Sequence, residues 1–423
     1  MGLNRRNFLG RGIGAGLGIA ALAAPMVAAQ GRPRVIVVGG GAGGASVARH
    51  LAQDSDGAID IILIEPTRSY YTCFFSNLYL GGLREMATLA HGYGRLAADY
   101  GINVVHDWVV GVDRDRLEVA LAGGGRLGYD RLVLSPGIDF IDGALPGWSV
   151  AAQNRMPHAY KAGSQTELLR AQVDAMRPGG TFALVAPPNP YRCPPGPYER
   201  VSMIARRLRA TNPTARILIV DPKDSFSKQA LFEEGWQAHY PGMIERIGPD
   251  FGADRIELRP ERMEIVIDGM VEAVDVCNAI PPMKAGRICD LAGVSEGYWA
   301  PVVPATMQAR ADPAIHVLGD AALQGDMPKS AFSANSQARV AAMAIRAALT
   351  GARAFPPRFT NTCWSLIDAE DGVKVGATYE ATEDRIARVD GFVSQPGEPA
   401  ALRRATYRES LDWYAAITRD MFG

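Results

Sequence analysis

Three glycines in the N-terminal part of this sequence are spaced as the motif G-x-G-x-x-G. They are Gly39, Gly41 and Gly44, and they follow an apolar run that begins at Arg34. A helical stretch comes next, and then a second apolar run that ends in Glu65. Such glycines let the backbone approach a pyrophosphate at a helix N-terminus, and the acid can accept a hydrogen bond from a ribose hydroxyl. Glycine loops also close tight turns that bind nothing, but the complete order of strand, loop, helix and acid-ending strand favours a dinucleotide site.

A second segment repeats this plan with an altered loop. It runs from Thr181 to Asp221, again as an apolar run, a loop, a helical stretch and an acid-ending apolar run. Its loop, residues 186–199, is rich in proline. Proline has no N–H and cannot adopt the left-handed conformations that glycine allows, so a phosphate cradle cannot be built from it. We therefore expect one bound dinucleotide rather than two, with Cys193 standing where the second would lie.

The identity of the dinucleotide is suggested by a third apolar run, residues 314–318, which ends in Gly319 and Asp320. A helix-like stretch, residues 330–349, follows. In flavoproteins with two dinucleotide domains, such a Gly-Asp turn returns to the first domain and its Asp bonds the flavin ribityl chain. An ordinary turn at the end of a strand is the alternative, but together with the glycine loop the pair indicates an FAD site.

The composition and the N-terminal segment restrict what the chain binds and where it works. With 423 residues it should hold two or three domains, and its net charge of −1 argues against nucleic acid as a partner. Residues 1–30 look like a twin-arginine signal, with Arg5 and Arg6 ahead of a small-residue run and a Val27-Ala-Ala cleavage pattern. A chance arginine pair before a membrane anchor is the alternative, but this run is weakly apolar for a permanent span, and no other stretch could cross a bilayer. We expect a periplasmic protein exported by the twin-arginine route, with no transmembrane segment in the mature chain.

The sequence has five cysteines: Cys73, Cys193, Cys277, Cys289 and Cys363. An odd number in an exported protein means that at least one is free, intermolecular or modified. No Cys-x-x-Cys-His occurs, so the chain itself carries no covalent c-type haem. The six histidines show no metal-ligand spacing, and we expect no metal site.

Two longer motifs are Tyr-Tyr-Thr-Cys, which ends at Cys73, and Arg-Cys-Pro-Pro-Gly-Pro-Tyr-Glu, which ends at Glu199. With these and further stretches the sequence closely resembles one known family, the flavoprotein subunit of flavocytochrome c sulfide dehydrogenase, over essentially the whole mature chain. The motifs Arg-Cys-Pro-Pro-Gly-Pro-Tyr-Glu and Tyr-Tyr-Thr-Cys are highly specific to it. The matching stretches are residues 35–45, 64–66, 70–73, 91–93, 104–107, 191–200, 327–330, 333–337, 361–363, 413–414 and 420–423.

The resemblance implies roles for individual residues, each of which has a simpler alternative. Cys73 would be joined by a thioether to the flavin 8α carbon, although a lone cysteine is more commonly buried and structural. Cys193 and Cys363 would form a redox-active disulfide at the flavin face, although spacing alone cannot reject a static structural disulfide. Glu199 would relay protons near that pair, or else be an exposed carboxylate that opens a helix. Trp413 would stand between flavin and partner, or pack a C-terminal amphipathic helix.

The expected fold is α/β, a glutathione-reductase-like flavoprotein with two dinucleotide domains built on parallel sheets and a C-terminal α+β interface domain. Residues 31–150 and 300–352 would form the FAD-binding domain. Residues 151–299 would form the altered, NAD-like domain, which binds no nucleotide. Residues 353–423 would carry Cys363 and a face for docking a partner.

The expected function is oxidation of hydrosulfide to polysulfide or zero-valent sulfur through the disulfide and covalent FAD, with electrons passed to a separate, dihaem c-type cytochrome. A sulfide:quinone oxidoreductase is one alternative, and a flavoprotein of the Sox system that keeps a sulfur carrier active is another. The sequence leaves open which cysteine hydrosulfide attacks, the sulfur product, the haem count and the roles of Cys277 and Cys289.

Overall fold

The computed structural model describes residues 31–423, so the expected signal segment, residues 1–30, lies outside the described residues. Residues Pro33–Gly423 form one compact unit, and the domain boundaries expected from the sequence therefore remain predictions. No helix in residues 31–423 has the length and apolar character that a membrane span requires.

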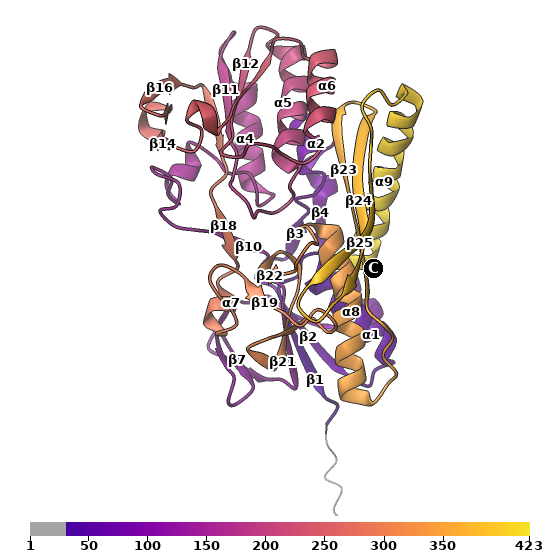
Figure 1. The fold of residues 1–423 in the computed structure, drawn as a ribbon. Coiled ribbons are helices and arrows are strands. Elements are labelled where there is room, and N and C mark those ends of the chain that lie inside the picture. The colour runs from indigo at the N-terminus through magenta and orange to yellow at the C-terminus, as the bar shows by residue number, and fades with distance from the viewer. Residues whose placement is uncertain (1–30) are drawn as a thin grey trace, which may run out of the picture. The chain divides into compact units, whose positions relative to one another are not determined.

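The N-terminal glycine loop follows β1, an inner strand of a six-stranded, mainly parallel sheet (Figure 1). In spatial order its strands are β20 (Gln308–Ala309), β21 (Asp312–Val317), β9 (Arg131–Leu134), β1 (Arg34–Val38), β2 (Asp60–Ile64) and β5 (Asn103–Val105). Val35, Ile36 and Val37 of β1 are fully buried, as expected for a central parallel strand covered on both faces. The chain returns to this sheet through β21, which pairs with β9 and brings Asp320 back to the first nucleotide unit.

Helices and small sheets complete this region. Its helices are α1 (Gly44–Ser55), α2 (Ser76–Leu80), α3 (Gly94–Tyr100), α7 (Ile288–Leu291) and α8 (Ala331–Thr350). Its smaller strands are β3 (Ser69–Tyr71) with β4 (Ala90–Gly92), β6 (Val109–Asp113), β7 (Glu118–Leu121) and β8 (Arg126–Gly128), and β19 (Ala300–Pro301) with β22 (Ala322–Leu323). Ser330 caps α8 by accepting a hydrogen bond from the backbone N–H of Ser333, which starts the helix beside the nucleotide loop.

The second nucleotide-like unit forms its own four-stranded parallel sheet. Its spatial order is β13 (Ile244–Ile247), β12 (Arg216–Val220), β11 (Thr181–Val185) and β17 (Val276–Ala279). Helices α4 (Ser164–Asp174), α5 (Gly196–Thr211) and α6 (Gln229–His239) accompany it, with a small sheet of β14 (Ile256–Arg259), β15 (Glu264–Ile267) and β16 (Met270–Ala273). Two antiparallel strands, β10 (Ile138–Phe140) and β18 (Met283–Ala285), carry the chain between the two larger sheets.

The C-terminal region is a three-stranded antiparallel sheet with one long helix. The elements are β23 (Arg358–Asp368), β24 (Asp371–Ala381), β25 (Ile386–Val393) and α9 (Ala400–Phe422). Figure 1 shows them beside both larger sheets, where β23 packs against α5, α6 and α8 and where α9 reaches α1. The predicted α/β class, with parallel sheets and a C-terminal α+β region, is confirmed.

Candidate active site

The glycine loop between β1 and α1 is shaped for close backbone approach. Gly39 has a φ of +99°, and a Cβ there would lie 2.4 Å from the Ser135 carbonyl oxygen. A Cβ on Gly44 would lie 1.8 Å from the Gly39 carbonyl oxygen. Side chains at these positions are therefore excluded, and the loop opens into a groove of about 310 Å³ that Gly39 and Gly41 line.

Two acidic residues line this groove. The carboxylate of Glu65 accepts hydrogen bonds from the backbone N–H of Gly40 at 2.9 Å and from the Thr67 hydroxyl at 2.7 Å. On the other side, Asp320 Oδ1 is buried with no hydrogen-bond partner among the described residues. Burial raises the pKa of Asp320, while Arg192 and Lys329 oppose the rise. An unsatisfied acceptor facing a glycine-lined groove fits the hydroxyls of a flavin dinucleotide, so Glu65 and Asp320 are suited to hold FAD.

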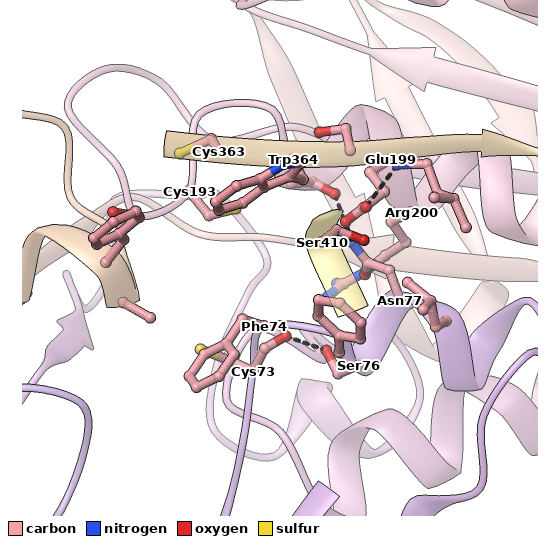
Figure 2. Close-up of a pocket in the computed structure, with 18 of the residues that line it drawn as sticks. Cys73, Phe74, Ser76, Asn77, Cys193, Glu199, Arg200, Cys363, Trp364 and Ser410 are labelled. Atoms are coloured by element: carbon pink, nitrogen blue, oxygen red, sulfur yellow. Dashed lines mark hydrogen bonds between the residues drawn. The ribbon is translucent and has the colours of Figure 1, made fainter. Parts of the chain in front are cut away.

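A smaller pocket of about 90 Å³ adjoins the groove and is lined by three of the five cysteines, Cys73, Cys193 and Cys363 (Figure 2). The groove and this thiol pocket share four lining residues: Cys73, Arg192, Ser330 and Ala331. The two spaces therefore meet at Cys73, the residue at which the family resemblance implies flavin attachment.

Cys193 is held by the proline-rich loop in a left-handed conformation, with a φ of +55°. Its backbone N–H donates to the Lys329 carbonyl at 2.7 Å, and its carbonyl accepts from Gly196 N–H at 2.8 Å. A Cβ on Gly196 would lie 2.9 Å from the Cys193 sulfur, so the glycine makes room for the thiol. Burial raises the pKa of Cys193 well above its ordinary value, and the neighbouring Cys363 adds to the rise.

Cys363 reaches the same pocket from β23. Asn361 Nδ2 lies 3.5 Å from its sulfur, and burial raises its pKa. All five cysteines are free thiols in the structure, so a bond between Cys193 and Cys363 remains a prediction. Cys277, on β17, and Cys289, in α7, are buried outside the thiol pocket.

Glu199 points into the protein from the first turn of α5, so its alternative interpretation as an exposed carboxylate is wrong. Its carboxylate accepts hydrogen bonds from Asn77 Nδ2 at 2.7 Å and from Leu366 N–H at 2.9 Å (Figure 2). Burial raises its pKa, and these two donors oppose the rise. A carboxyl group with a raised pKa beside two thiols is suited to accept and return protons.

Trp413, on α9, lies in an aromatic cluster at this pocket. Its ring centroid is 5.5 Å from that of Phe74, 5.9 Å from that of Phe332 and 5.1 Å from that of Trp364. The ring therefore lies beside the thiol pocket, and it also packs α9. Its role in electron transfer remains a prediction.

Sequence reasoning missed several pocket residues. Arg192 stands in the motif Arg-Cys-Pro-Pro-Gly-Pro-Tyr-Glu but was given no role, and the signal for Trp364 was that it directly follows Cys363 in sequence. Arg200 is buried and donates to Asn77 Oδ1 at 3.1 Å, which orients the amide that bonds Glu199. Lys228 donates to the Cys363 carbonyl, and nothing in its sequence surroundings indicated this position.

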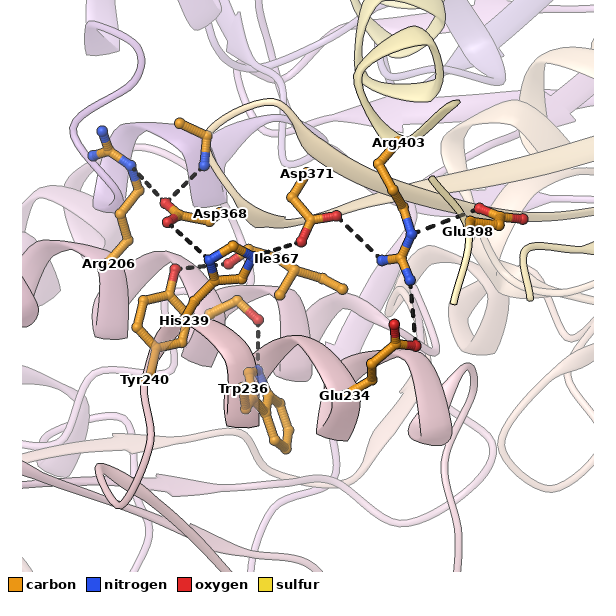
Figure 3. Close-up of polar contacts among 12 residues, drawn as sticks. Arg206, Glu234, Trp236, His239, Tyr240, Ile367, Asp368, Asp371, Glu398 and Arg403 are labelled. Atoms are coloured by element: carbon orange, nitrogen blue, oxygen red, sulfur yellow. Dashed lines mark hydrogen bonds and ion pairs between the residues drawn. The ribbon is translucent and has the colours of Figure 1, made fainter. Parts of the chain in front are cut away.

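Ion pairs fasten the turn between β23 and β24 to α5, α6 and α9 (Figure 3). His239 lies between Asp368 and Asp371, with nitrogen–oxygen distances of 3.6 and 2.7 Å. Arg403 of α9 reaches Asp371 at 3.1 Å and Glu234 of α6 at 3.4 Å. These contacts hold the strand that carries Cys363 against the region that carries Cys193.

The acid that ends the second nucleotide-like unit is engaged within the protein. Asp221 is fully buried, with Lys223 Nζ at 2.6 Å, the Tyr198 hydroxyl at 2.7 Å and Arg246 Nε at 3.1 Å. Lys223 also donates to the carbonyl of Pro187 in the proline-rich loop. A carboxylate so occupied has no free oxygen for a ribose.

Three family models match separate parts of the chain. Residues 33–173 match the pyridine nucleotide-disulphide oxidoreductase model. Residues 166–281 match the model described as the central part of the sulfide dehydrogenase (flavocytochrome c) flavoprotein chain, and residues 355–422 match that described as flavocytochrome c sulphide dehydrogenase, flavin-binding.

Individual proteins agree with these models. A sulfide dehydrogenase (flavocytochrome c) flavoprotein chain from Chlorobaculum thiosulfatiphilum is 51% identical over 47 residues, which are 11% of this chain and 96% of the relative. Among solved structures, sulfide:quinone oxidoreductase from Aquifex aeolicus covers 92% of each chain, with a TM-score of 0.68 and 15% identity. A ferredoxin reductase from Rhodopseudomonas palustris covers 81% of this chain and 82% of its own, with a TM-score of 0.63 and 20% identity. These likenesses confirm the predicted two-dinucleotide-domain fold.

Proposed function

The chain belongs to the flavoprotein chains of flavocytochrome c sulfide dehydrogenase, and on this premise we propose that it oxidises hydrosulfide and passes the electrons to a c-type cytochrome. It is an FAD-dependent oxidoreductase. The observation that carries the proposal is the junction at Cys73, where a dinucleotide groove opens into a pocket that holds two further thiols.

We propose that Cys193 and Cys363 form a disulfide in the oxidised enzyme, because both thiols line one small pocket. Hydrosulfide attacks one sulfur, a new sulfur–sulfur bond forms, and the old bond breaks to leave one persulfide and one thiolate. A second hydrosulfide takes the outer sulfur of the persulfide as hydrodisulfide and leaves both cysteines reduced. In total, two hydrosulfide ions become one hydrodisulfide ion, one proton and two electrons.

FAD, when bound, accepts the two electrons as a pair and gives them up singly. The chain's residues hold and orient the reactants. Glu199 accepts the proton that the reaction releases, because its carboxylate faces the pocket and its raised pKa suits proton exchange. The aromatic walls, among them Trp364 and Phe74, exclude water from the thiols.

We propose that Cys73 carries the flavin through a thioether, since it is the cysteine that lines both the groove and the thiol pocket. Acid precipitation of wild-type protein should leave the flavin with the polypeptide, whereas Cys73→Ser should release it. Cys289→Ser is a control for loss of a cysteine away from the groove. Complete release of flavin from the wild type would show that the attachment is wrong.

The electron acceptor is proposed to be a separate, dihaem cytochrome that docks near Trp413. Export to the periplasm, where such cytochromes work, is part of this proposal, and N-terminal sequencing of the mature protein tests it by showing cleavage near residue 30. The likeness in fold to a sulfide:quinone oxidoreductase supports a quinone as the alternative acceptor. Assays with cytochrome c and with a soluble quinone, run side by side, distinguish the two.

The central test is reduction of the flavin by sulfide in a stopped-flow instrument. Sulfide should bleach wild-type flavin within the time of mixing, and a c-type cytochrome should then be reduced. Cys193→Ser and Cys363→Ser should each abolish bleaching by sulfide but not by dithionite, which needs no disulfide. Unchanged sulfide turnover in both variants would overturn the mechanism, and retention of flavin in both excludes loss of the fold as the cause.

A further inference from the structure

Lys228 is a buried cation placed directly against the strand that carries Cys363. It precedes α6 in a left-handed conformation with a φ of +64°, and it is 9% exposed. Its ammonium donates to the Cys363 carbonyl at 3.1 Å and to Ser365 Oγ at 2.8 Å. Both acceptors lie on β23, so the charge is fixed relative to the Cys363 thiol.

This ammonium has no carboxylate partner within ion-pair distance among residues 31–423. Lys223, another buried lysine, differs, because its Nζ lies 2.6 Å from Asp221. A buried ammonium without a counterion is costly, and burial accordingly lowers the pKa of Lys228 to about 8. The negative charges that oppose this shift are those of Cys363, Glu199 and Cys193, in that order.

The two cysteines differ in the groups that can stabilise their ionised forms. Around Cys363, the Asn361 amide, the Ser330 hydroxyl and Lys228 all lower its pKa, against burial and Glu199, which raise it. Around Cys193, burial, Cys363, Glu199 and Cys73 raise the pKa, and Arg192 lowers it. Arg192 also faces Asp320, with 3.8 Å between the charged groups.

Resting on the function proposed above, we propose that Lys228 is a positioning residue that stabilises the Cys363 thiolate as the leaving group and thereby directs hydrosulfide to Cys193. In this step the bond between the hydrosulfide sulfur and Cys193 Sγ forms. The Cys193–Cys363 bond breaks, and its electron pair stays on Cys363 Sγ. The persulfide is therefore on Cys193, and the Cys363 thiolate offsets the charge of the buried ammonium, which is hydrogen-bonded to the carbonyl of the same residue.

A thiol leaves faster from a disulfide when its thiolate is more stable. Because Lys228 favours the thiolate of Cys363, Cys363 is the leaving group and hydrosulfide attacks the sulfur of Cys193. The titratable groups that face Cys363 are Lys228, Glu199, Cys193 and Tyr379. Lys228 is the cation among them, and its replacement by a neutral side chain should make the Cys363 thiolate harder to form.

The first test reads the ionisation of Cys363 without sulfide. Flavin-loaded Cys193→Ser protein is treated with iodoacetamide across a range of pH, and alkylation of Cys363 is followed by peptide mass spectrometry. Adding Lys228→Met should raise the pH midpoint by about one unit, the typical effect of one nearby charge. Lys228→Arg should keep the midpoint close to its original value. Lys284→Met is the control for loss of a lysine elsewhere, because Lys284 of β18 forms its ion pair with Asp290 of α7. If Lys228→Met leaves the pH midpoint of Cys363 alkylation unchanged, the proposed role of Lys228 is wrong, and this conclusion does not depend on whether the enzyme oxidises sulfide.

The second test reads the direction of attack. Disulfide-form wild type receives less than one equivalent of sulfide, is quenched with iodoacetamide, and is mapped for the persulfide. We expect the extra sulfur on Cys193, and a shift toward Cys363 in Lys228→Met. A persulfide on Cys363 in the wild type would overturn the direction. A persulfide on neither cysteine would count against the proposed function, while the alkylation midpoint would still decide the role of Lys228.

Discussion

Two regions of this molecule share one local plan and differ in what they can bind. The strands β1 and β2 pair in parallel from Arg34 to Val38, and β11 and β12 pair in parallel in the same way from Thr181 to Val185. After the first strand of each pair, one loop comprises residues 39–43 and the other the longer residues 186–195. The short loop is glycine-rich and lines the dinucleotide groove, whereas the long loop is proline-rich and places the Cys193 thiol in the thiol pocket.

The acidic residues that follow β2 and β12 also differ between the two units. Glu65 lines the groove, and its partners are backbone and hydroxyl donors beside it. Asp221 is fully buried between Lys223, Arg246 and Tyr198. The two units therefore share a strand–loop–helix geometry but differ in their loop residues and in the partners of their acids, and we expect these differences to decide which unit binds a nucleotide.

The largest expected effect comes from adding one methyl group to Gly44, the first residue of α1, directly after the first loop. In Gly44→Ala the new Cβ would meet the Gly39 carbonyl oxygen, a backbone atom that cannot move away cheaply. We expect loss of nearly all bound flavin and a destabilisation of about 4 kcal/mol or more. Gly196→Ala is the matched change in the second unit, where the closest atom is the Cys193 sulfur. It should keep its flavin but react more slowly with sulfide. Flavin content is read from absorbance, and equal flavin loss in both variants would erase the contrast.

The second unit should not accept a nicotinamide. NADH and NADPH should reduce the flavin at least about a thousandfold more slowly than sulfide does, which corresponds to about 4 kcal/mol in the barrier. The reason is that the prolines supply no N–H groups for a pyrophosphate and that Asp221 is occupied. Anaerobic mixing with each reductant measures this, and rapid reduction by NADH would show that the second unit still binds nucleotide.

The two acids should give opposite phenotypes when each is made neutral. Asp221→Asn leaves Lys223 and Arg246 without their buried counterion and should cost about 3 kcal/mol of unfolding free energy, with flavin content unchanged. Glu65→Gln should leave folding nearly unchanged and weaken FAD binding by about tenfold. The affinity is measured in the Cys73→Ser background, where a covalent link cannot mask it. Denaturant titration and flavin titration of both variants check the pair, and a loss of FAD affinity in Asp221→Asn at constant stability would contradict the comparison.

The last expected effect concerns Glu199, which helix α5 of the second unit supplies. Because burial raises its pKa, the carboxyl takes up a proton at a higher pH than an ordinary glutamate as the pH falls. Wild-type sulfide oxidation should therefore fall with decreasing pH through this raised pKa. The Glu199→Gln variant should oxidise sulfide about 10- to 100-fold more slowly at neutral pH, and its rate should not show this fall at acidic pH. The rates are corrected for the ionisation of sulfide itself. If the variant shows the same fall at acidic pH as the wild type, Glu199 is excluded as the proton acceptor.

Local sequence was enough to predict the nucleotide-binding unit, because its determinants lie close together along the chain. The glycines act on their own backbone, and Glu65 reaches the N–H of Gly40 in the neighbouring loop. The prediction that the second unit binds no nucleotide also rests on local sequence, since proline removes N–H groups wherever it stands. The motifs around Cys73, Cys193 and Cys363 were likewise enough to indicate the family, although the sequence identity to the similar solved structures is low.

The tertiary structure alone decided how the thiol pocket is assembled and charged. Cys193 lies in the loop between β11 and α5 and Cys363 lies on β23, and ion pairs such as Arg403–Asp371 hold those regions together. Lys228 reaches Cys363 only because α6 packs against β23, and no spacing in the sequence encodes that contact. The burial of Glu199 was equally hidden, since its partners Asn77 and Leu366 lie far from it in the chain. A site that depends on local backbone conformation, such as the glycine loop, can be predicted from the sequence. The charge and burial of a side chain cannot, because they depend on which distant segments the fold brings together.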